Sequence, residues 1–337
     1  MLQRQTVVHG QVFRKAMKGN VMTNDSIKIG ISFSSEMIRL IEVERWNGKL
    51  NLTNALQIAL PKSFDPLTIG DVKSIPLISD TIDKACEHLN PQIKTAKICI
   101  DRKLALKKTF AVDKGLLENE IRQHIEWELE QLLIAPRDEY NVGFEQIIFP
   151  KLKNDVVVFA AIRKAIVQYL RDIFAKSRFQ LDSVDLDVFA SLRTLAYAYP
   201  DKLRGITALI EFLASGIGIT ILYDGKYALS SEMPSVINEK KYQHLSTPEL
   251  ASAVRTELNK LLEHLKENLD ISPLNRILVA GENADKSLVA ELNQQNPEAV
   301  VAMVEPFQNA HRQLNIESQK LIDEHGECFV ACFGMVL

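Results

Sequence analysis

The chain carries the same order of predicted elements twice, and this duplication limits the folds that it can adopt. In both halves, three strands joined by hairpins lead into an amphipathic helix and then into a short buried strand. The first copy has its strands at 28–33, 37–44, 49–60 and 96–100 and its helix at 77–89. The second copy has its strands at 206–212, 217–223, 226–232 and 275–280 and a helix that begins at Ser246. Two copies of such a unit predict two similar lobes, each with a mixed sheet and helical cover.

Further elements are expected between and after the two copies. Residues 200–205 (PDKLRG) break the pattern and separate the halves. A length of 337 residues agrees with about two domains, since a typical domain has ~150 residues. We expect strands at 104–112, 140–149, 155–162, 179–185 and 299–304, helices at 116–134, 163–176 and 187–199, and a closing helix at 327–337.

Charge and composition exclude several classes of protein. The 40 Lys and Arg residues nearly balance the 43 Asp and Glu residues, which leaves a net charge of -3. A general nucleic-acid binder needs a basic excess to neutralise phosphates, so we expect no nucleic-acid partner. The 46% of apolar residues is too high for a disordered chain. No apolar run reaches the ~18 residues that cross a bilayer, and the start lacks an export signal pattern, so we expect a cytoplasmic location.

The cysteines predict neither a disulfide framework nor a metal site. Cys86, Cys99, Cys328 and Cys332 form no CxxC pair, which agrees with a reducing cytosol. Cys328 and Cys332 share one face of the closing helix, but the local chain adds only His325 as a further ligand. Since structural zinc sites use four ligands, we interpret both thiols as packing residues and expect no metal.

Residues 1–26 form a basic tail whose amphipathic pattern allows two interpretations. Positive charges alternate with apolar residues, and no acid comes before Asp25. Such a stretch can lie on an anionic membrane surface, where each basic residue close to the lipid contributes about 1 kcal/mol. A frayed chain start is the alternative. The predicted membrane-contact residues are Arg4, Phe13, Arg14, Lys15 and Lys18.

Several blocks of the sequence share their order and spacing with one protein family. Residues 29–43 (IGISFSSEMIRLIEV) occupy the place of a first phosphate hairpin. Residues 118–144 (ENEIRQHIEWELEQLLIAPRDEYNVGF) combine an acidic helix, a proline and a strand, and further blocks lie at 159–195, 208–234 and 276–284. In this order they resemble the PilM family, the actin-like proteins of type IV pilus assembly platforms. The resemblance touches nearly every region after residue 27.

The resemblance implies a fold and a division into domains. We expect an α/β protein with an actin-like (ribonuclease H-like) duplicated fold, whose two lobes face each other across a cleft. Residues 27–103, continued by 163–200, form the first subdomain in this prediction, and residues 201–337 form the second lobe. Residues 104–162 form a small inserted α+β subdomain.

The resemblance also implies partners. Proteins of this family bind the short N-terminal cytoplasmic peptide of a PilN-like bitopic inner-membrane protein, and they link that platform to the pilus assembly ATPases. We therefore expect a non-enzymatic adaptor that is cytoplasmic and peripheral to the inner membrane. In the family the peptide groove lies between the first subdomain and the insert. Leu104, Leu106 and Phe110, on the first strand of the insert, are our groove candidates, although apolar residues on a strand equally face a core.

A nucleotide site of the actin-like type needs two Asp-x-Gly hairpins and a glycine-rich turn. The carboxylate organises Mg²⁺ and its waters, and the glycines let backbone N–H groups approach the phosphates. In the first hairpin, Ser32 and Ser34 stand at the Asp and Gly positions. In the second, Glu211 and Leu213 stand there. The residues that retain part of the nucleotide-binding pattern are Ser34, Ser35, Glu211, Ser215, Gly216 and Gly281.

These losses weigh against tight binding of Mg-ATP, so we expect no cofactor. The alternative is an actin-like ATP-binding protein or ATPase whose nucleotide state controls partner binding. A small-molecule kinase of the same fold is a third interpretation, but we find no credible catalytic Asp at the cleft. The sequence contains no HxxxH, HExxH, GxSxG or GxxxxGK[ST] motif, so it points to no other catalytic chemistry.

Overall fold

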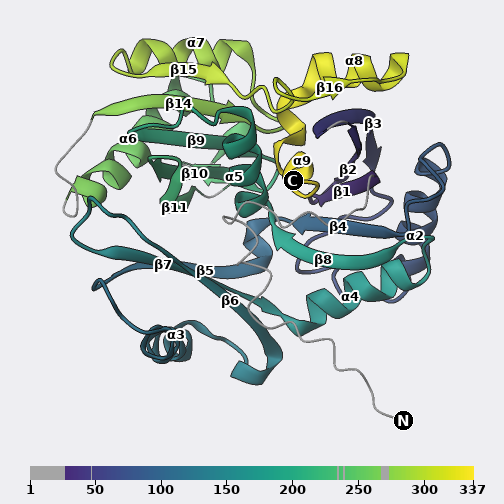
Figure 1. Ribbon diagram of the computed structural model, residues 1–337, viewed down its shortest axis with the longest axis horizontal. Coiled ribbons are helices and arrows are strands. Elements are labelled where there is room, and N and C mark those ends of the chain that lie inside the picture. The colour runs from purple at the N-terminus through teal and green to yellow at the C-terminus, as the bar shows by residue number, and fades with distance from the viewer. Residues whose placement is uncertain (1–26, 47, 234, 238–239, 267–272) are drawn as a thin grey trace.

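Two sheets with the same strand order confirm the predicted duplication (Figure 1). The computed structural model describes residues 27–46, 48–233, 235–237, 240–266 and 273–337. The first sheet has the order β16-β3-β2-β1-β4-β8. β1, β2 and β3 form an antiparallel meander, β4 is parallel to β1, and β8 is parallel to β4. The strands are β1 (Ile27–Phe33), β2 (Met37–Trp46), β3 (Lys49–Ala59), β4 (Thr95–Ile100), β8 (Gln180–Leu186) and β16 (His311–Arg312).

The second sheet repeats this arrangement in the order β11-β10-β9-β14-β15. Its first three strands again form an antiparallel meander, and β14 and β15 continue the sheet in parallel. A repeated order of three antiparallel and two parallel strands gives the protein a two-lobed actin-like fold. The strands are β9 (Ile206–Leu213), β10 (Gly216–Tyr223), β11 (Lys226–Met233), β14 (Leu274–Ala280) and β15 (Val300–Met303). A small ribbon, β12 (Val236–Ile237) with β13 (Lys240–Lys241), follows β11.

Helices cover both sheets. In the first lobe α2 packs against α4, which lies along β8, and in the second lobe α6 packs against α7 and β11. The sequence did not predict α7 and α8, which have only 10 residues each. Their signals were the N-cap side chains of Asp285 and Asn315, which accept hydrogen bonds from the N–H groups of Leu288 and Ser318. The helices are α2 (Ser74–Ala85), α4 (Lys164–Ala175), α5 (Asp187–Ala198), α6 (Thr247–Lys266), α7 (Lys286–Gln295), α8 (Ile316–His325) and α9 (Val330–Gly334), with 3-10 turns η3 (Tyr242–His244) and η4 (Gly326–Phe329).

The C-terminal segment returns to the first lobe. β16 pairs with β3, α8 contacts β3, and α9 packs on β1 and α5. This differs from the predicted assignment of all of 201–337 to the second lobe. The reason is burial, because Phe307 and Phe333 complete an apolar core with Ile41 and Val43 of β2. The C-terminal segment therefore connects the second lobe back to the first lobe.

Two glycines allow α9 to approach its neighbours closely. A Cβ atom on Gly30 of β1 would lie 2.4 Å from the carbonyl oxygen of Cys332. A Cβ on Gly334 would lie 1.8 Å from the carbonyl oxygen of Ala190 in α5. The thiol of Cys332 is fully buried and donates to the carbonyl oxygens of Gly30 and Arg39 at 3.0 and 3.2 Å. Cys332 is thus a packing residue, as the sequence predicted.

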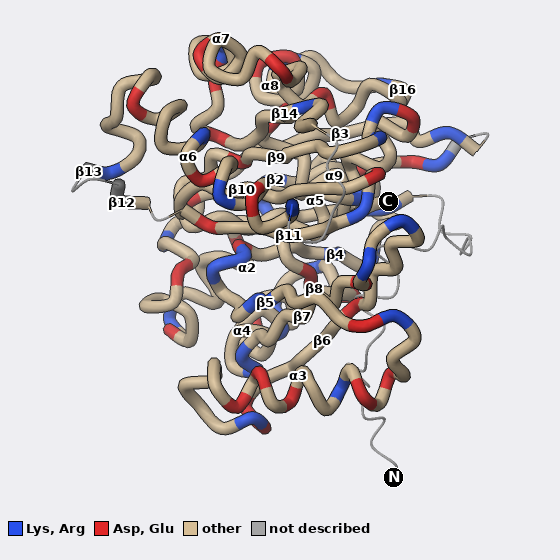
Figure 2. The backbone as a smooth tube through the Cα atoms, turned by 90° about the vertical axis from the view of Figure 1, so that its left-hand side faces the viewer, with Lys and Arg blue, Asp and Glu red and all other residues tan. Residues whose placement is uncertain are grey.

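A separate three-stranded sheet, in the order β5-β7-β6, lies beside the lobes (Figure 1). One face is covered by α3, whose Ile121, Ile125 and Leu129 form a small core with the sheet. The outer side of α3 carries several acidic residues (Figure 2). On the other face, the Thr109 hydroxyl shares a 2.7 Å hydrogen bond with Tyr227 of β11, which joins the insert to the second lobe. The elements are η1 (Arg102–Leu104), β5 (Ala105–Val112), α3 (Glu118–Leu132), η2 (Arg137–Glu139), β6 (Tyr140–Ile147) and β7 (Asp155–Arg163).

Within the part of the chain that the structure describes, no helix combines the length and apolarity needed to span a bilayer. The basic tail lies outside the described residues. The predicted membrane contacts of Arg4, Phe13, Arg14, Lys15 and Lys18 therefore stay predictions.

Candidate interlobe site

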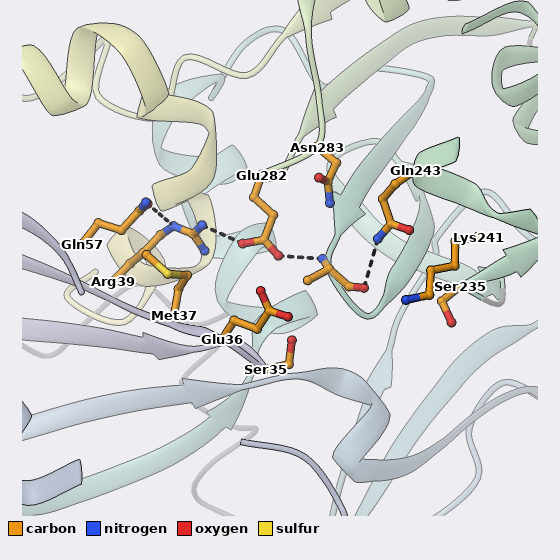
Figure 3. A pocket seen from close by; sticks show the side chains of 11 residues that line it. Ser35, Glu36, Met37, Arg39, Gln57, Ser235, Lys241, Gln243, Glu282 and Asn283 are labelled. Carbon is orange, nitrogen blue, oxygen red and sulfur yellow. Dashed lines mark hydrogen bonds and ion pairs between the residues drawn. The ribbon is translucent and has the colours of Figure 1, made fainter. Parts of the chain in front are cut away.

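A polar pocket of about 450 Å³ lies between the two lobes (Figure 3). One wall comes from the turn between β1 and β2 and from side chains of β2 and β3. The opposite wall comes from the turns that follow β9 and β14 and from Ser235, Lys241 and Gln243. The pocket is therefore part of the interlobe cleft, where the two altered hairpins meet. Its lining residues are Ser35, Glu36, Met37, Arg39, Gln57, Ala214, Ser235, Lys241, Gln243, Glu282 and Asn283.

An ion pair between Arg39 and Glu282 crosses the cleft at the wall of this pocket (Figure 3). Arg39 Nη2 lies 2.6 Å from Glu282 Oε2, and the two side chains are 8% and 15% exposed. Gln57 Oε1 accepts a 2.8 Å hydrogen bond from Arg39 Nε, which fixes the guanidinium on the first sheet. The second carboxylate oxygen of Glu282 accepts a 2.6 Å hydrogen bond from the backbone N–H of Ala214. Glu282 thus uses a backbone donor of the second hairpin.

Polar groups of the first hairpin form hydrogen bonds within its own turn. Ser34 N donates to the Met37 carbonyl at 2.9 Å, and Ser34 Oγ accepts from Met37 N at 3.2 Å. The Ser35 carbonyl accepts from the Phe64 N–H at 2.7 Å, while the Ser35 side chain lines the pocket. Ser35 therefore lies at the pocket and Ser34 is bonded within the turn, and the nucleotide-binding role of both stays a prediction.

The second hairpin is contacted by a lysine from the start of the insert. Lys103 Nζ donates a hydrogen bond to the carbonyl oxygen of Ser215. Gly216 has a φ of +147°, and a Cβ there would lie 2.7 Å from the Met233 carbonyl oxygen and 2.8 Å from Lys103 Nζ. The glycine is thus needed for the close approach of β11 and of the ammonium. The ammonium of Lys103 thus lies against Ser215 and Gly216, and the nucleotide-binding role of these two residues stays a prediction.

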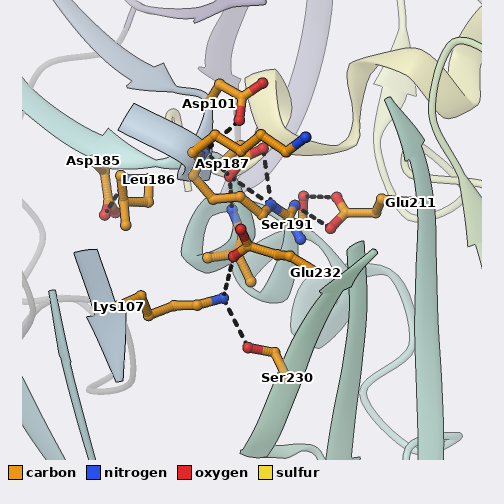
Figure 4. A network of polar contacts seen from close by, with 12 residues as sticks. Asp101, Lys107, Asp185, Leu186, Asp187, Ser191, Glu211, Ser230 and Glu232 are labelled. Carbon is orange, nitrogen blue, oxygen red and sulfur yellow. Dashed lines mark hydrogen bonds and ion pairs between the residues drawn. The ribbon is translucent and has the colours of Figure 1, made fainter. Parts of the chain in front are cut away.

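Arg102 lies at the centre of a buried polar network, and Figure 4 labels its partners Asp187 and Glu211. Its Nε lies 3.0 and 3.1 Å from the two carboxylate oxygens of Asp187, at the start of α5. Its Nη2 donates to Glu211 Oε2 on β9. Arg102 is 2% exposed and Glu211 is 3% exposed. One guanidinium therefore joins the insert, the first lobe and the second lobe.

The ionic state of this network follows from burial and charge. Burial alone would lower the pKa of Arg102, but the charges of Asp187 and Glu211 outweigh it and hold the pKa above its ordinary value. Burial raises the pKa of Asp187 to about 7, and the adjacent Arg102 opposes that rise. The other oxygen of Glu211 accepts a 2.6 Å hydrogen bond from the hydroxyl of Ser191. Both oxygens of Glu211 are therefore bonded to the protein.

Gly281 forms a tight turn against the second hairpin. It has a φ of +103°, and a Cβ there would lie 2.4 Å from the carbonyl oxygen of Phe212. That carbonyl also accepts a 3.1 Å hydrogen bond from Asn283 N. Backbone conformation and lack of space thus account for this glycine.

The groups present do not fit a bound Mg-nucleotide. Glu211 is neutralised by Arg102, and the Ala214 N–H is bonded to Glu282. Arg102 Nη1 lies over Gly218, so that a Cβ there would come within 2.3 Å of it. The atoms that would meet a magnesium ion and a phosphate are thus bonded to side chains of the chain itself.

Sequence reasoning missed Arg102 and Asp187 as functional residues. The only signal was the run Asp101-Arg102-Lys103 directly after the buried strand β4. Such a charged run ordinarily lies in solvent, but here Asp101 caps η1 through a 2.9 Å hydrogen bond from Lys103 N. This turn directs Arg102 inward.

The three predicted groove residues contribute to the packing of the protein. Leu104 is 8% exposed and belongs to the main apolar core. Leu106 and Phe110 pack into the core beneath α3, where the Phe110 ring stacks on His124 at 4.5 Å. Their role in a partner groove stays a prediction.

Among the described residues, one mixed group of ligand atoms lies close together, in His325, Glu327 and Cys328, all within 4.8 Å. Burial raises the pKa of the Cys328 thiol to about 12, so this sulfur is protonated near neutral pH. The group offers three ligands, fewer than the four of a structural zinc site, so we assign no metal to it.

The chain is similar to known proteins in sequence and in fold. Residues 30–234 match the family model described as type IV pilus assembly protein PilM. A solved PilM-PilN type IV pilus biogenesis complex is similar in fold, with a TM-score of 0.69 and 15% identity, over 91% of this chain and 97% of that chain. A protein of Bacteroides thetaiotaomicron with an actin-like ATPase fold and unknown function gives a TM-score of 0.46 at 13% identity, over 90% of this chain and 99% of that chain. Since the family model matches more than half of the sequence, the chain belongs to the PilM family of type IV pilus assembly proteins.

Proposed function

We propose that this protein is a non-enzymatic adaptor in the cytosolic layer of a type IV pilus assembly platform. In this role it binds the cytoplasmic N-terminal peptide of a PilN-like bitopic inner-membrane protein and contacts the pilus assembly ATPases. Family membership supports the assembly role. The solved complex whose fold it shares contains a PilM chain together with PilN. The proposed location is cytoplasmic and peripheral to the inner membrane.

An edge strand of the insert carries the peptide-binding proposal. β6 lies at one end of the order β5-β7-β6, and no other strand in the described part of the chain pairs with its outer side. An extended peptide can add to such an edge through main-chain hydrogen bonds. β6 belongs to the insert, one of the two parts that border the peptide groove in the family resemblance, and this supports the proposal.

The side chains of β6 place apolar residues on one face of the sheet and an acidic residue on the other. Val142 and Phe144 pack toward α3, so Glu145 points to the opposite face of the sheet. Burial raises the pKa of Glu145 to about 7, and the nearby charge of Asp185 adds to the rise. A half-buried carboxylate with a second acid beside it favours a peptide that brings a positive charge or an N–H donor.

We propose that no nucleotide or metal cofactor takes part. The bonded state of Glu211 and Glu282 supports this part of the proposal. The alternative, an ATP-binding protein whose nucleotide state controls partner binding, predicts a rise in melting temperature with Mg-ATP.

We propose further that the pilus is of the mannose-sensitive haemagglutinin type, with this chain as its MshI-type component. The modest length of the chain and its basic N-terminal sequence support this assignment. In this proposal the basic tail contacts anionic lipid. Flotation with anionic liposomes, comparing the full chain with one that lacks residues 1–26, tests the lipid contact.

Calorimetric titration of the full chain with the N-terminal peptide of a PilN-like protein from the same organism tests the adaptor role. We expect saturable binding and slower amide exchange along β6. Glu145→Arg should weaken binding by about tenfold or more, since one lost charge contact corresponds to roughly 1.4 kcal/mol. Glu130→Arg, which reverses an exposed acid of α3 on the other side of the insert, is the matched control and should change affinity less than twofold.

The result that overturns the adaptor proposal is an absence of heat and of chemical-shift change at large peptide excess. Equal weakening by the two variants would instead place the peptide away from β6.

A further inference from the structure

We propose that the interlobe cleft carries built-in ionic substitutes for a metal–phosphate ligand. Arg102 takes the place of the divalent cation, and the carboxylate of Glu282 takes the place of a phosphate oxygen. The two lobes are then held together without a bound nucleotide. This inference concerns the cleft alone and does not depend on the adaptor role or on the pilus type.

The surroundings of Arg102 resemble those of a bound divalent cation. A divalent cation in a protein site is held by carboxylate oxygens from elements that the ion joins. Asp187 and Glu211 provide such oxygens from the two lobes, and both contact the guanidinium. Backbone N–H groups of Arg102 and Val188 also donate to Asp187 Oδ1, at 3.1 and 2.7 Å. Backbone donors thus hold Asp187 and the Ser191 hydroxyl holds Glu211, and both carboxylates contact the same guanidinium.

The second lobe has a space that fits the guanidinium. Gly218 of β10 lies opposite Glu211 in the sheet. A Cβ at Gly218 would lie 2.3 Å from Arg102 Nη1 and 3.0 Å from the central guanidinium carbon. Since Arg102 is 2% exposed, it has no room to move aside. The missing side chain on β10 is thus part of the site for this cation.

The donors around Glu282 resemble those around a bound phosphate oxygen. A phosphate oxygen in a hairpin site is typically bound by backbone N–H groups and by a guanidinium or ammonium. Glu282 Oε1 accepts from the Ala214 N–H of the second hairpin, and Oε2 accepts from Arg39 of the first sheet, each at 2.6 Å. One carboxylate therefore uses both kinds of donor and joins the two lobes through them.

Removal of each substitute should create a requirement for the ion that it replaces. Arg102→Met leaves Asp187 and Glu211 without a cation, and Glu282→Ala leaves the Ala214 N–H and Arg39 without an anion. The experiment measures thermal unfolding of the full-length proteins in chelator, in millimolar MgCl₂ and in millimolar inorganic phosphate, at matched ionic strength. The wild-type midpoint should not respond to either ion.

We expect a crossed pattern of rescue. Arg102→Met should lower the midpoint by about 10 °C, and MgCl₂ but not phosphate should restore much of this loss. Glu282→Ala should lower it by a few degrees, and phosphate but not MgCl₂ should restore the loss. Arg193→Met is the control. It removes the 2.6 Å ion pair of the buried Asp185 but leaves Arg102 and its two carboxylate partners unchanged. Its loss should respond to neither ion.

Two results would overturn the proposal. One is a wild-type midpoint that rises with MgCl₂, phosphate or Mg-ATP. The other is a pair of variants, Arg102→Met and Glu282→Ala, that respond to the ions no more than Arg193→Met does. If Arg102→Met does not fold in chelator, the yield of folded protein after refolding with and without MgCl₂ takes the place of the midpoint. Glu282→Ala, which alters a less buried residue, keeps the anion half testable in either case.

Discussion

The two ion pairs that cross the cleft lie in different surroundings. Arg102 and Glu211 are almost fully buried, whereas Arg39 and Glu282 line a pocket and are 8% and 15% exposed. A buried charge that loses its partner stays in a medium of low dielectric, while a charge at a pocket wall can be hydrated. We call the Arg102–Glu211 pair the deep joint and the Arg39–Glu282 pair the outer joint. The deep joint is therefore the stronger connection between the lobes, and the outer joint is the weaker one.

The largest difference between the two joints should appear in their coupling energies. A double-mutant cycle with Arg102→Met and Glu211→Gln should give a coupling of about 3 kcal/mol in the free energy of unfolding, because Arg102→Met leaves the buried charge of Glu211 unpaired and Glu211→Gln removes that charge. Urea unfolding of the four proteins measures this coupling. A value below about 1 kcal/mol would mean that the deep pair is no stronger than a surface pair.

A smaller loss should follow when the deep joint is disturbed from the opposite sheet. Gly218→Ala brings a Cβ within 2.3 Å of Arg102 Nη1 and should cost about 2 kcal/mol of stability through overpacking. Gly326→Ala is the control, since its Cβ would meet nothing closer than 3.9 Å. Denaturant midpoints measure both effects, and equal midpoints for the two variants would contradict a tight fit around Arg102.

The outer joint should be weaker and should depend on salt. A cycle with Arg39→Met and Glu282→Gln should give a coupling of about 1 kcal/mol that decreases as salt is added, because the pair borders a solvent-filled pocket. The same urea experiment at low and high sodium chloride measures it. A salt-independent coupling as large as that of Arg102 with Glu211 would remove the difference between the two joints.

The smallest effect concerns Glu145 in the insert, a half-buried acid that belongs to neither of the two ion pairs across the cleft. Burial and Asp185 raise the pKa of Glu145 from 4.5 to about 7 in the folded protein. The folded state therefore binds more protons than the unfolded state in this window, and stability should fall as pH rises from about 4.5 to 7. Glu145→Gln should remove this dependence and gain no more than about 1 kcal/mol at pH 8, since partial exposure reduces the effect. Thermal midpoints at pH 5 and pH 8 for both proteins give the measurement, and an unchanged pH dependence in the variant would exclude Glu145 as its source.

Most of the fold could be predicted because its signals are local. The two meanders, the long helix of the insert and the start of α6 near Ser246 all follow from apolar spacing and turn residues within one segment. The short helices α7 and α8 were missed because their apolar stripes are brief. The return of residues 307–337 to the first lobe was missed because nothing local distinguishes Phe307 and Phe333 from core residues of the second lobe.

The candidate site was predictable only in part. Ser35 lines the pocket between the lobes, Ser215 accepts a hydrogen bond from Lys103, and Gly281 lies in a tight turn against Phe212, while the nucleotide-binding role of all three stays a prediction. Arg102 could not be identified in this way, because its partners Asp187 and Glu211 lie 85 and 109 residues away along the chain. The groove role of Leu106 and Phe110 stays a prediction, since in the sequence an apolar residue on a strand looks the same whether it faces a groove or a core.

The sequence by itself determined most of the elements, their duplication and the loss of one acidic and two glycine positions in the hairpins, since periodicity and turn chemistry act over a few residues. Only the tertiary structure decided which charges are buried together and how the C-terminal segment joins the lobes. The physical reason is that the free energy of a charge depends on solvent exposure and on partners from distant segments, and both are set when the lobes pack.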